Sequence, residues 1–274
     1  RMHDLDMKVL IDLVPNHVAR SYNSDIRPEA SFGRKDDKGQ FFHPQNNFFY
    51  LEPEDEAGDR APLKLPTVNP ETGEVVSGTA RIVGGADGLY PPEARHGRVT
   101  GNNVARWQPG NGDWYETVKL NYGYNYRNPQ PKPDYPSSIT QDALIPPTWK
   151  VMDEVIAYWQ SMGVDGFRSD MSHMVPPEFW KWAIHRAQQR NPDVFFMAEA
   201  YNDDPAKVQS REPTLSSGSG VNVMVALLDA GFHAVYDDPG YDKLMDIYER
   251  GAWANDLQNV EAGLGPFYFD CSVR

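Results

Sequence analysis

Residues 163–170, which read Gly-Val-Asp-Gly-Phe-Arg-Ser-Asp, predict a short buried strand that ends in a carboxylate. Gly163 and Gly166 stand where a strand is entered and where another backbone comes close. Because side chains alternate faces along a strand, Arg168 and Asp170 point the same way, and the guanidinium favours the ionised carboxylate. The pair suits a catalytic nucleophile, and it suits a structural ion pair at a strand end equally well.

The segments around this strand alternate between strands and helices. Nearly continuous apolar runs predict further buried strands over 7–14, 193–199 and 232–236, and a strand that begins at 267. Prolines and helical spacing predict helices from Pro146 or Pro147 and over 176–190, 221–230, 239–250 and 255–262. Such alternation implies a parallel sheet or barrel with right-handed crossovers. The strands are too few for a closed eight-stranded barrel of ~250 residues, so we expect an open sheet or a piece of a barrel.

Residues 18–135 form the long stretch without a clear helix. They are rich in Gly, Pro, Asn and Asp, with short candidate strands over 40–42, 80–83 and 116–120. A structureless stretch of this length is improbable in a compact domain, so we expect a small inserted domain of loops and short strands. It separates a barrel region over 1–17 from (β/α) units over 136–274. Its core is expected to use most of Trp107, Trp114, Tyr115, Tyr122, Tyr124 and Tyr126.

The bulk composition excludes several classes of partner. The formal net charge is −13 over 274 residues, which argues against nucleic acid and against anionic membrane surfaces. No apolar run approaches the ~20 residues of a membrane span. The single cysteine, Cys271, excludes internal disulfides. The oligomeric state and the compartment, whether a bacterial cytoplasm or outside the cell, stay open.

Polar residues follow the ends of successive predicted strands, the position where α/β folds place their sites. These residues are Asn16 with His17, Arg168 with Asp170, Glu199, and Asp237 with Asp238. For the last two a strand-end or helix-cap role is preferred.

Asp170 and Glu199 are separated by one helix and one strand, so their strands are expected to be neighbours. Neighbouring strands lie ~4.8 Å apart, which predicts a carboxyl separation of ~5 Å, as in retaining glycosidases. Arg168 should keep Asp170 ionised. Glu199 follows apolar residues and has no obvious local cation, so we expect its pKa to be raised, as a general acid requires.

Three motifs together resemble the α-amylase family, glycoside hydrolase family thirteen. Residues 12–17 (Asp-Leu-Val-Pro-Asn-His), 166–170 (Gly-Phe-Arg-Ser-Asp) and the strand that ends at Glu199 match three of its four characteristic regions in order and spacing. Residues 120–122 (Leu-Asn-Tyr) are similar to the short region that closes the family's inserted B domain. The resemblance implies a partial (β/α)8 TIM barrel, from about strand 3 to the start of strand 7, with the B domain after strand 3.

The resemblance also implies catalytic roles. Asp170 would be the nucleophile that forms a β-glycosyl-enzyme, and Glu199 the general acid/base. Arg168, with Asp12, would orient Asp170. The fourth region, an Asn-His-Asp that supplies a third carboxylate, would follow Arg274. We therefore expect the 274 residues alone to have little or no hydrolase activity.

Further residues are implied to bind sugar or metal. His17 would bind a sugar hydroxyl and His173 a leaving-group sugar, whereas Asn16 would be a ligand of a structural calcium ion. Strand-end capping is the alternative for Asn16 and His17, and hydrogen bonding at a helix start is the alternative for His173. No organic cofactor is implied. The remaining calcium ligands stay open among Asp36, Asp37, Asp87 and Asp113.

Three functions remain in competition. The first is a retaining hydrolase that cleaves α-1,4 bonds of starch-like or glycogen-like α-glucans, and the second is a transglycosylase or maltosyltransferase of the same family. The third is a non-catalytic carbohydrate-binding relative, against which the presence of Arg168, Asp170 and Glu199 counts. Product analysis with maltoheptaose separates the first two, and an Asn-His-Asp beyond Arg274 would favour an enzyme.

Overall fold

A computed structural model describes residues 2–25, 27–51, 63–67, 72, 87–128, 145–201, 223–251, 253 and 272–273. The chain divides into two compact units. Unit 1 contains residues 1–15, 134–143 and 152–274, and unit 2 contains residues 16–133 and 144–151. Asn16 and His17 therefore fall in unit 2, although they were expected in the barrel region. The other expected boundary, at 135, lies outside the described residues, as do the strand predicted over 80–83 and the helix predicted over 255–262.

Unit 1 is built on a parallel sheet of five strands in the order β1-β6-β7-β8-β9, which is also their order in the chain. This arrangement puts the carboxyl ends of all five strands at one edge. The strands span Leu10–Leu13 (β1), Gly166–Ser169 (β6), Phe195–Ala198 (β7), Ala234–Tyr236 (β8) and Ser272–Val273 (β9).

The two glycines before β6 behave as their positions in the sequence predict. Gly163 has φ +87°, a backbone conformation that side chains disfavour, and it turns the chain out of the preceding helix. A Cβ at Gly166 would collide with the carbonyl oxygen of Phe195, so this glycine lets β6 and β7 approach. The rings of Phe167 in β6 and Phe196 in β7 stack on each other, with their centroids 5.2 Å apart.

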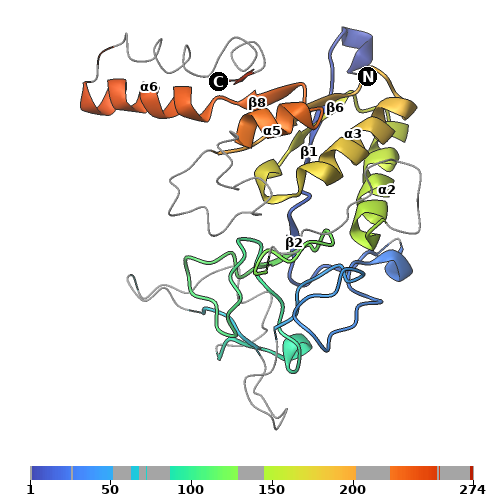
Figure 1. The fold of residues 1–274 in the computed structure, drawn as a ribbon, viewed down its shortest axis with the longest axis vertical. Coiled ribbons are helices and arrows are strands. Elements are labelled where there is room, and N and C mark those ends of the chain that lie inside the picture. The colour runs from blue at the N-terminus through green and yellow to red at the C-terminus, as the bar shows by residue number, and fades with distance from the viewer. Residues whose placement is uncertain are drawn as a thin grey trace. The chain divides into compact units, whose positions relative to one another are not determined.

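The helices of unit 1 follow the predicted alternation. They are α3 (Pro177–Arg190), α5 (Val223–Asp229) and α6 (Asp238–Arg250), together with most of α2 (Pro147–Ser161), whose first turn is assigned to unit 2. The predicted apolar face of α3 is buried, with Phe179, Trp180, Ala183, Ile184 and Ala187 all at 1% exposure or less. Helix α5 lies beside α3 (Figure 1). Asp237 accepts a hydrogen bond from the backbone of Gly240 and caps α6, which confirms the preferred helix-cap role.

Strand β1 departs from the prediction of a strand buried on both faces. Leu10 is 41% exposed, and Met7 and Val14 beside the strand are 46% and 38% exposed. The reason is the position of β1 at the edge of the sheet, where its only described strand partner is β6. The apolar run predicted the strand correctly but not its place in the sheet.

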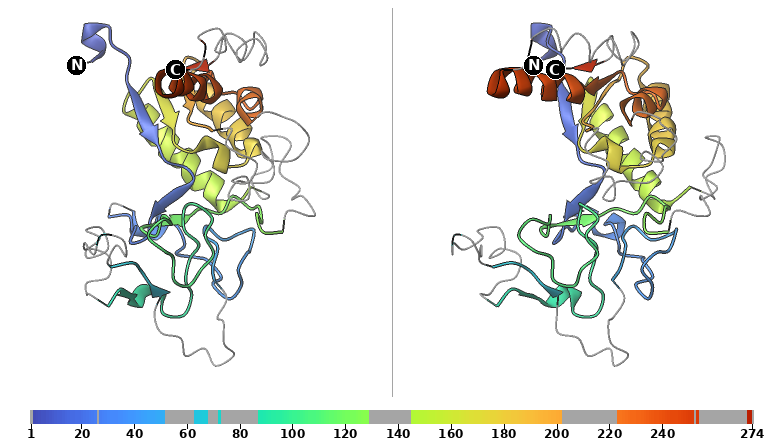
Figure 2. Two further views of the ribbon diagram at one scale, coloured as in Figure 1. Left: turned by 90° about the vertical axis from the view of Figure 1, so that its left-hand side faces the viewer. Right: turned by 60° about the vertical axis from the view of Figure 1, so that its left-hand side comes forward.

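Unit 2 consists mostly of loops, held by short strands (Figure 2). Strand β2 (His17–Ala19) pairs with β5 (Thr117–Lys119), and β3 (Leu63–Lys64) pairs with β4 (Leu89–Tyr90), both antiparallel. The strand predicted over 116–120 is thus confirmed. The strand predicted over 40–42 is wrong, since residues 40 and 41 form a bend and residue 42 has no regular secondary structure.

The aromatic residues of unit 2 build its core, as predicted for most of them. Tyr115, Tyr122 and Tyr124 are 7% exposed or less, and Trp107 and Tyr126 pack against the cluster that contains Tyr115. The identity of unit 2 as the family's B domain stays a prediction. Among the residues that the model describes, no helix combines the length and apolar character of a membrane span.

Candidate active site

The sheet of unit 1 brings Arg168, Asp170 and Glu199 to the same strand ends. In β6 and β7, Arg168 is in register with Met197 and Ser169 with Ala198. The pairing continues past both strands, because the backbone nitrogen of Glu199 donates to the carbonyl of Ser169 at 2.9 Å. The carboxyl groups of Asp170 and Glu199 both contact the guanidinium group of Arg168, so the two lie close together at neighbouring strand ends.

Arg168 is shared by three carboxylates. Its Nη1 lies 2.8 Å from Oδ1 of Asp12 and 3.0 Å from Oδ1 of Asp170, and its Nη2 lies 2.7 Å from Oε2 of Glu199. The predicted contacts with Asp12 and Asp170 are present. The ion pair with Glu199 was not predicted, because it depends on the reach of the guanidinium across to the next strand.

Glu199 is also held by neutral donors. The hydroxyl of Tyr201 donates to its Oε1 at 2.6 Å, and the backbone nitrogen of Met171 donates to its Oε2 at 3.0 Å. Met171 has φ +46°, so the chain turns sharply just after Asp170 and aims this backbone group at the carboxylate. The carboxyl group of Glu199 is therefore fixed from several sides.

These contacts reverse the expected order of the pKa values of the Asp170 and Glu199 carboxyl groups. Burial, together with the hydrogen bond and the charge of Glu199, raises the pKa of Asp170 from 3.8 to about 6. Burial also acts to raise the pKa of Glu199, but the hydrogen bonds from Tyr201 and Met171 and the charge of Arg168 outweigh it, so this pKa is lowered. The expectation that Glu199 has the raised pKa of the two is therefore wrong. Below about pH 6 a proton resides on Asp170, and the surroundings favour Glu199 as the ionised member.

Two tyrosines complete the site, and sequence reasoning did not name them. Tyr201 stands two residues beyond Glu199, the spacing that keeps side chains on one face of an extended segment, and this signal was available in the sequence. Tyr236 ends β8, and its hydroxyl lies 3.1 Å from Nε of Arg168. The guanidinium also lies 5.6 Å from the centre of the Tyr236 ring. Tyr236 thus supports the guanidinium from the neighbouring strand end.

His173 lies in the turn that follows β6. It belongs to the short helix Ser172–Met174 and is 2% exposed, with its ring edge-on to that of Tyr201 at a centroid distance of 5.9 Å. The residue is therefore packed against the site rather than open to solvent. Its predicted contact with a leaving-group sugar stays a prediction.

Asn16 and His17 lie in unit 2 and form a group of their own. Asn16 is fully buried, and its Oδ1 accepts a hydrogen bond from the ammonium group of Lys119. The His17 ring packs edge-on to Trp114 at 5.4 Å. Burial and the charge of Lys119 lower the pKa of His17 to about 4, so the ring is neutral at physiological pH and suits a hydrogen-bonding role. Sugar binding by His17 stays a prediction.

The carboxylates considered as further calcium ligands are engaged elsewhere in unit 2. Asp36 accepts hydrogen bonds from the backbone of Asn47 and Phe48 and from the Tyr50 hydroxyl. Asp37 and Asp87 accept backbone hydrogen bonds from nearby loop residues, and Asp113 pairs with Arg106. Across the described ranges, no cluster of three or more His, Cys, Asp or Glu side chains suits a metal ion. The Oδ1 of Asn16 faces the ammonium group of Lys119, a neighbour that does not suit a calcium ion on this oxygen.

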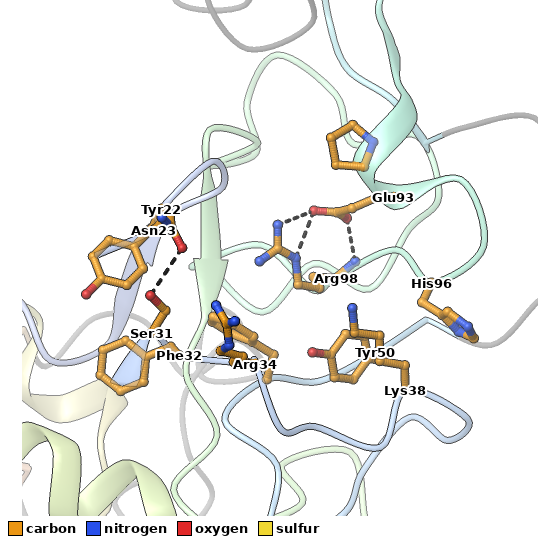
Figure 3. A pocket seen from close by; sticks show the side chains of 13 residues that line it. Tyr22, Asn23, Ser31, Phe32, Arg34, Lys38, Tyr50, Glu93, His96 and Arg98 are labelled. Carbon is orange, nitrogen blue, oxygen red and sulfur yellow. Dashed lines mark hydrogen bonds and ion pairs between the residues drawn. The ribbon is translucent and has the colours of Figure 1, made fainter. Parts of the chain in front are cut away.

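A pocket of about 250 Å³ also lies in unit 2 (Figure 3). Aromatic side chains that include Tyr22 and Tyr50 line it, and its polar wall contains the ion pair between Glu93 and Arg98. Glu93 also pairs with Arg20, which is 1% exposed. These charged groups bind one another, so the catalytic prediction stays with unit 1.

Comparisons with curated proteins give short local similarities. No family model matches the chain. An α-1,4-glucan:maltose-1-phosphate maltosyltransferase from Myxococcus xanthus is 40% identical over 53 residues, which is 19% of this chain and 8% of that protein. A protein of the same name from Pseudomonas aeruginosa is 31% identical over 100 residues, which is 35% of this chain and 14% of that protein. The matched part is thus a small fraction of each relative.

The solved structures define the fold. An α-amylase from Lactobacillus plantarum aligns with a TM-score of 0.50 and 18% identity, over 96% of this chain and 40% of that chain. The chain is therefore a partial α/β barrel of the α-amylase type, and the fold prediction is confirmed. The resemblance to the α-amylase family is confirmed by this fold together with the local similarity to the maltosyltransferases.

Proposed function

We propose that the complete protein cleaves α-glucosidic bonds of α-glucans with retention of configuration. The observation that carries this proposal is that the carboxyl groups of Asp170 and Glu199, at adjacent strand ends, bind one guanidinium group, that of Arg168. An inverting enzyme keeps its two carboxyl groups ~6.5–9.5 Å apart to leave room for a water molecule, whereas a retaining enzyme brings them to ~5 Å. The close pair in unit 1 favours retention.

The reaction proceeds in two displacements. The carboxylate of Asp170 attacks the anomeric carbon while the bond to the leaving oxygen breaks, and Glu199 gives its proton to that oxygen. Glu199 then takes a proton from the acceptor hydroxyl, whose oxygen attacks the anomeric carbon and releases Asp170. Arg168, held by Asp12 and Tyr236, positions the nucleophile throughout.

The first displacement requires an ionised Asp170 and a protonated Glu199. The contacts of Glu199 with Arg168, Tyr201 and Met171 favour its ionised form instead. We infer that sugar binding displaces part of the contact between Arg168 and Glu199 and moves the proton to Glu199.

Hydrolysis of α-1,4 bonds is the first form of this function, with water as acceptor. Transfer to a second sugar is the alternative, and the local similarity to maltosyltransferases favours it. Both forms use Asp170 and Glu199 in the same roles. The difference lies in whether water or a sugar hydroxyl reaches the glycosyl-enzyme.

Proton NMR of the first products from maltoheptaose tests the proposal. Retention predicts that the newly formed reducing end is the α anomer, and a β anomer would refute the double displacement. Chromatography of the same mixture separates the two forms, because hydrolysis gives only shorter sugars and transfer also gives longer ones. Binding of maltoheptaose without any turnover would instead support the non-catalytic carbohydrate-binding alternative.

A further inference from the structure

The orientation of the Asn16 side chain is fixed by its neighbours in unit 2. Its Nδ2 donates to the carbonyl oxygen of Gly101 at 2.8 Å and lies 3.2 Å from Nδ1 of His17. Its Oδ1 therefore faces Lys119, whose ammonium group donates to it. A flipped amide would bring an NH₂ group against the ammonium, and two donors cannot bond to each other.

The ammonium group of Lys119 is held in place by the strands around it. Lys119 is 1% exposed, and in the antiparallel pair of β2 and β5 it lies opposite His17. Its backbone nitrogen donates to the carbonyl of Val99 at 2.9 Å, and the nitrogen of Leu120 donates to the carbonyl of Asn16 at 2.9 Å. Backbone hydrogen bonds thus fix the main chain of both Asn16 and Lys119, and the burial of Lys119 keeps its side chain out of solvent.

A calcium ion on Oδ1 of Asn16 is incompatible with this contact. Calcium binds oxygen ligands at ~2.3–2.6 Å and favours sites rich in carboxylates. An ion on this oxygen would have the Lys119 ammonium as its neighbour, and the two positive charges would repel each other. Asp36 and Asp113, which might have offset that charge, are bound to other groups.

We propose that the ammonium group of Lys119 takes the place of a metal ion at Asn16. The ammonium places a positive charge next to the amide oxygen of Asn16 and donates a hydrogen bond to it. This hydrogen bond connects β5 to the residue that precedes β2. The folding of unit 2 then does not depend on calcium at this position. A chelator should leave the Asn16 contact intact, whereas loss of the ammonium should weaken it.

Thermal unfolding of the complete protein in EDTA and in CaCl₂ tests the proposal. The variants are Asn16→Leu, which removes the amide oxygen at similar volume, Lys119→Met, which removes the charge but keeps the stem, and Lys35→Met as an exposed control. The calcium-induced change in Tm should be equal in the wild type and Asn16→Leu. Lys119→Met should lower the Tm by about 4 °C or more, without recovery in calcium, as loss of a buried charged hydrogen bond requires. Lys35→Met should have the Tm of the wild type.

Two outcomes would overturn the proposal. The first is a calcium-induced rise in Tm that the wild type shows and Asn16→Leu loses, since this places an ion on the amide oxygen. The second is a Lys119→Met protein with the wild-type Tm. If one variant fails to fold, the other still decides the question. Both results are melting temperatures, so they are independent of the proposed activity.

Discussion

The two units use the same ionic groups in opposite proportions. In unit 2 one carboxylate, that of Glu93, is shared by two guanidinium groups, those of Arg20 and Arg98. In unit 1 one guanidinium, that of Arg168, is shared by three carboxylates. The first cluster is saturated with hydrogen bonds, whereas the second holds more negative charge than its cation can satisfy.

This difference separates a structural cluster from a functional one. Glu93 is 2% exposed and accepts hydrogen bonds from the side chains of both arginines, and Arg20 also donates to backbone carbonyls in the core of unit 2. Such a network has little to gain from a ligand. Asp170 and Glu199, in contrast, cannot both ionise without cost, and a reacting sugar between them relieves that conflict. Variants of each cluster should therefore fail in different ways.

Asp170→Asn should have the largest effect on activity. An amide cannot form the glycosyl-enzyme, so turnover of maltoheptaose by the complete protein should fall by about 10⁴-fold or more. The measurement is the initial rate of reducing-end release. Asp193→Asn, an exposed carboxylate of unit 1 outside the cluster, is the matched control and should keep the wild-type rate. Near-normal turnover by Asp170→Asn would show that Asp170 is not the nucleophile.

Glu199→Gln should lower turnover by about 10²–10⁴-fold, the range for loss of a general acid. The loss should shrink for an α-maltosyl fluoride, because fluoride leaves without a proton. The ratio of the two losses is the informative number. Equal losses for both substrates would mean that Glu199 acts in some way other than proton donation.

Glu93→Gln should damage stability and not chemistry. It leaves the buried guanidinium of Arg20 and the partly buried one of Arg98 without their anion, and a buried ion pair that loses one partner costs about 3–5 kcal/mol. Chemical denaturation should show this fall in the free energy of unfolding, with kcat per folded molecule unchanged. Glu29→Gln, in an exposed pair with Arg27, is the control and should be neutral. A lower kcat for fully folded Glu93→Gln would contradict a purely structural role for the cluster around Glu93.

The proton on Asp170 predicts a pH dependence of stability. Its pKa is raised from 3.8 to about 6, so between these values the folded state binds a proton that the unfolded chain has released. Stability should therefore fall as pH rises through this window. The lowered pKa of Glu199 acts in the opposite sense only at lower pH, below its ordinary value of 4.5. Asp170→Asn should flatten the Tm between pH 4.5 and about 6, and an unchanged slope would show that another group holds the proton.

Tyr201→Phe should have the smallest effect. Loss of its hydrogen bond raises the pKa of Glu199, so the alkaline limb of the rate profile should move up by about one pH unit at most. Tyr236→Phe is the matched control, because its hydroxyl contacts Arg168 and not Glu199. Equal shifts in both variants would contradict the assigned contact.

The sequence predicted the backbone of the site better than its electrostatics. Gly163, Gly166 and the alternation of apolar runs predicted the strands and their parallel order, because these depend on local pattern and on chain connectivity. The edge position of β1 was missed, since an apolar run does not reveal how many neighbours a strand has. Arg168 was assigned to Asp12 and Asp170 but not to Glu199, because sequence spacing does not show the reach of a guanidinium to the next strand. The contact of Lys119 with Asn16 joins residues far apart in the chain, and no local pattern predicts it.

The most direct test of the double displacement is to trap the glycosyl-enzyme. α-Maltosyl fluoride reacts with the Glu199→Gln variant of the complete protein without needing the acid, and the missing base slows release of the sugar. Mass spectrometry of the digested protein should then find a maltosyl group on the peptide that contains Asp170. Fluoride release with the sugar on another residue, or with no labelled peptide at all, would contradict the role of Asp170 as the nucleophile.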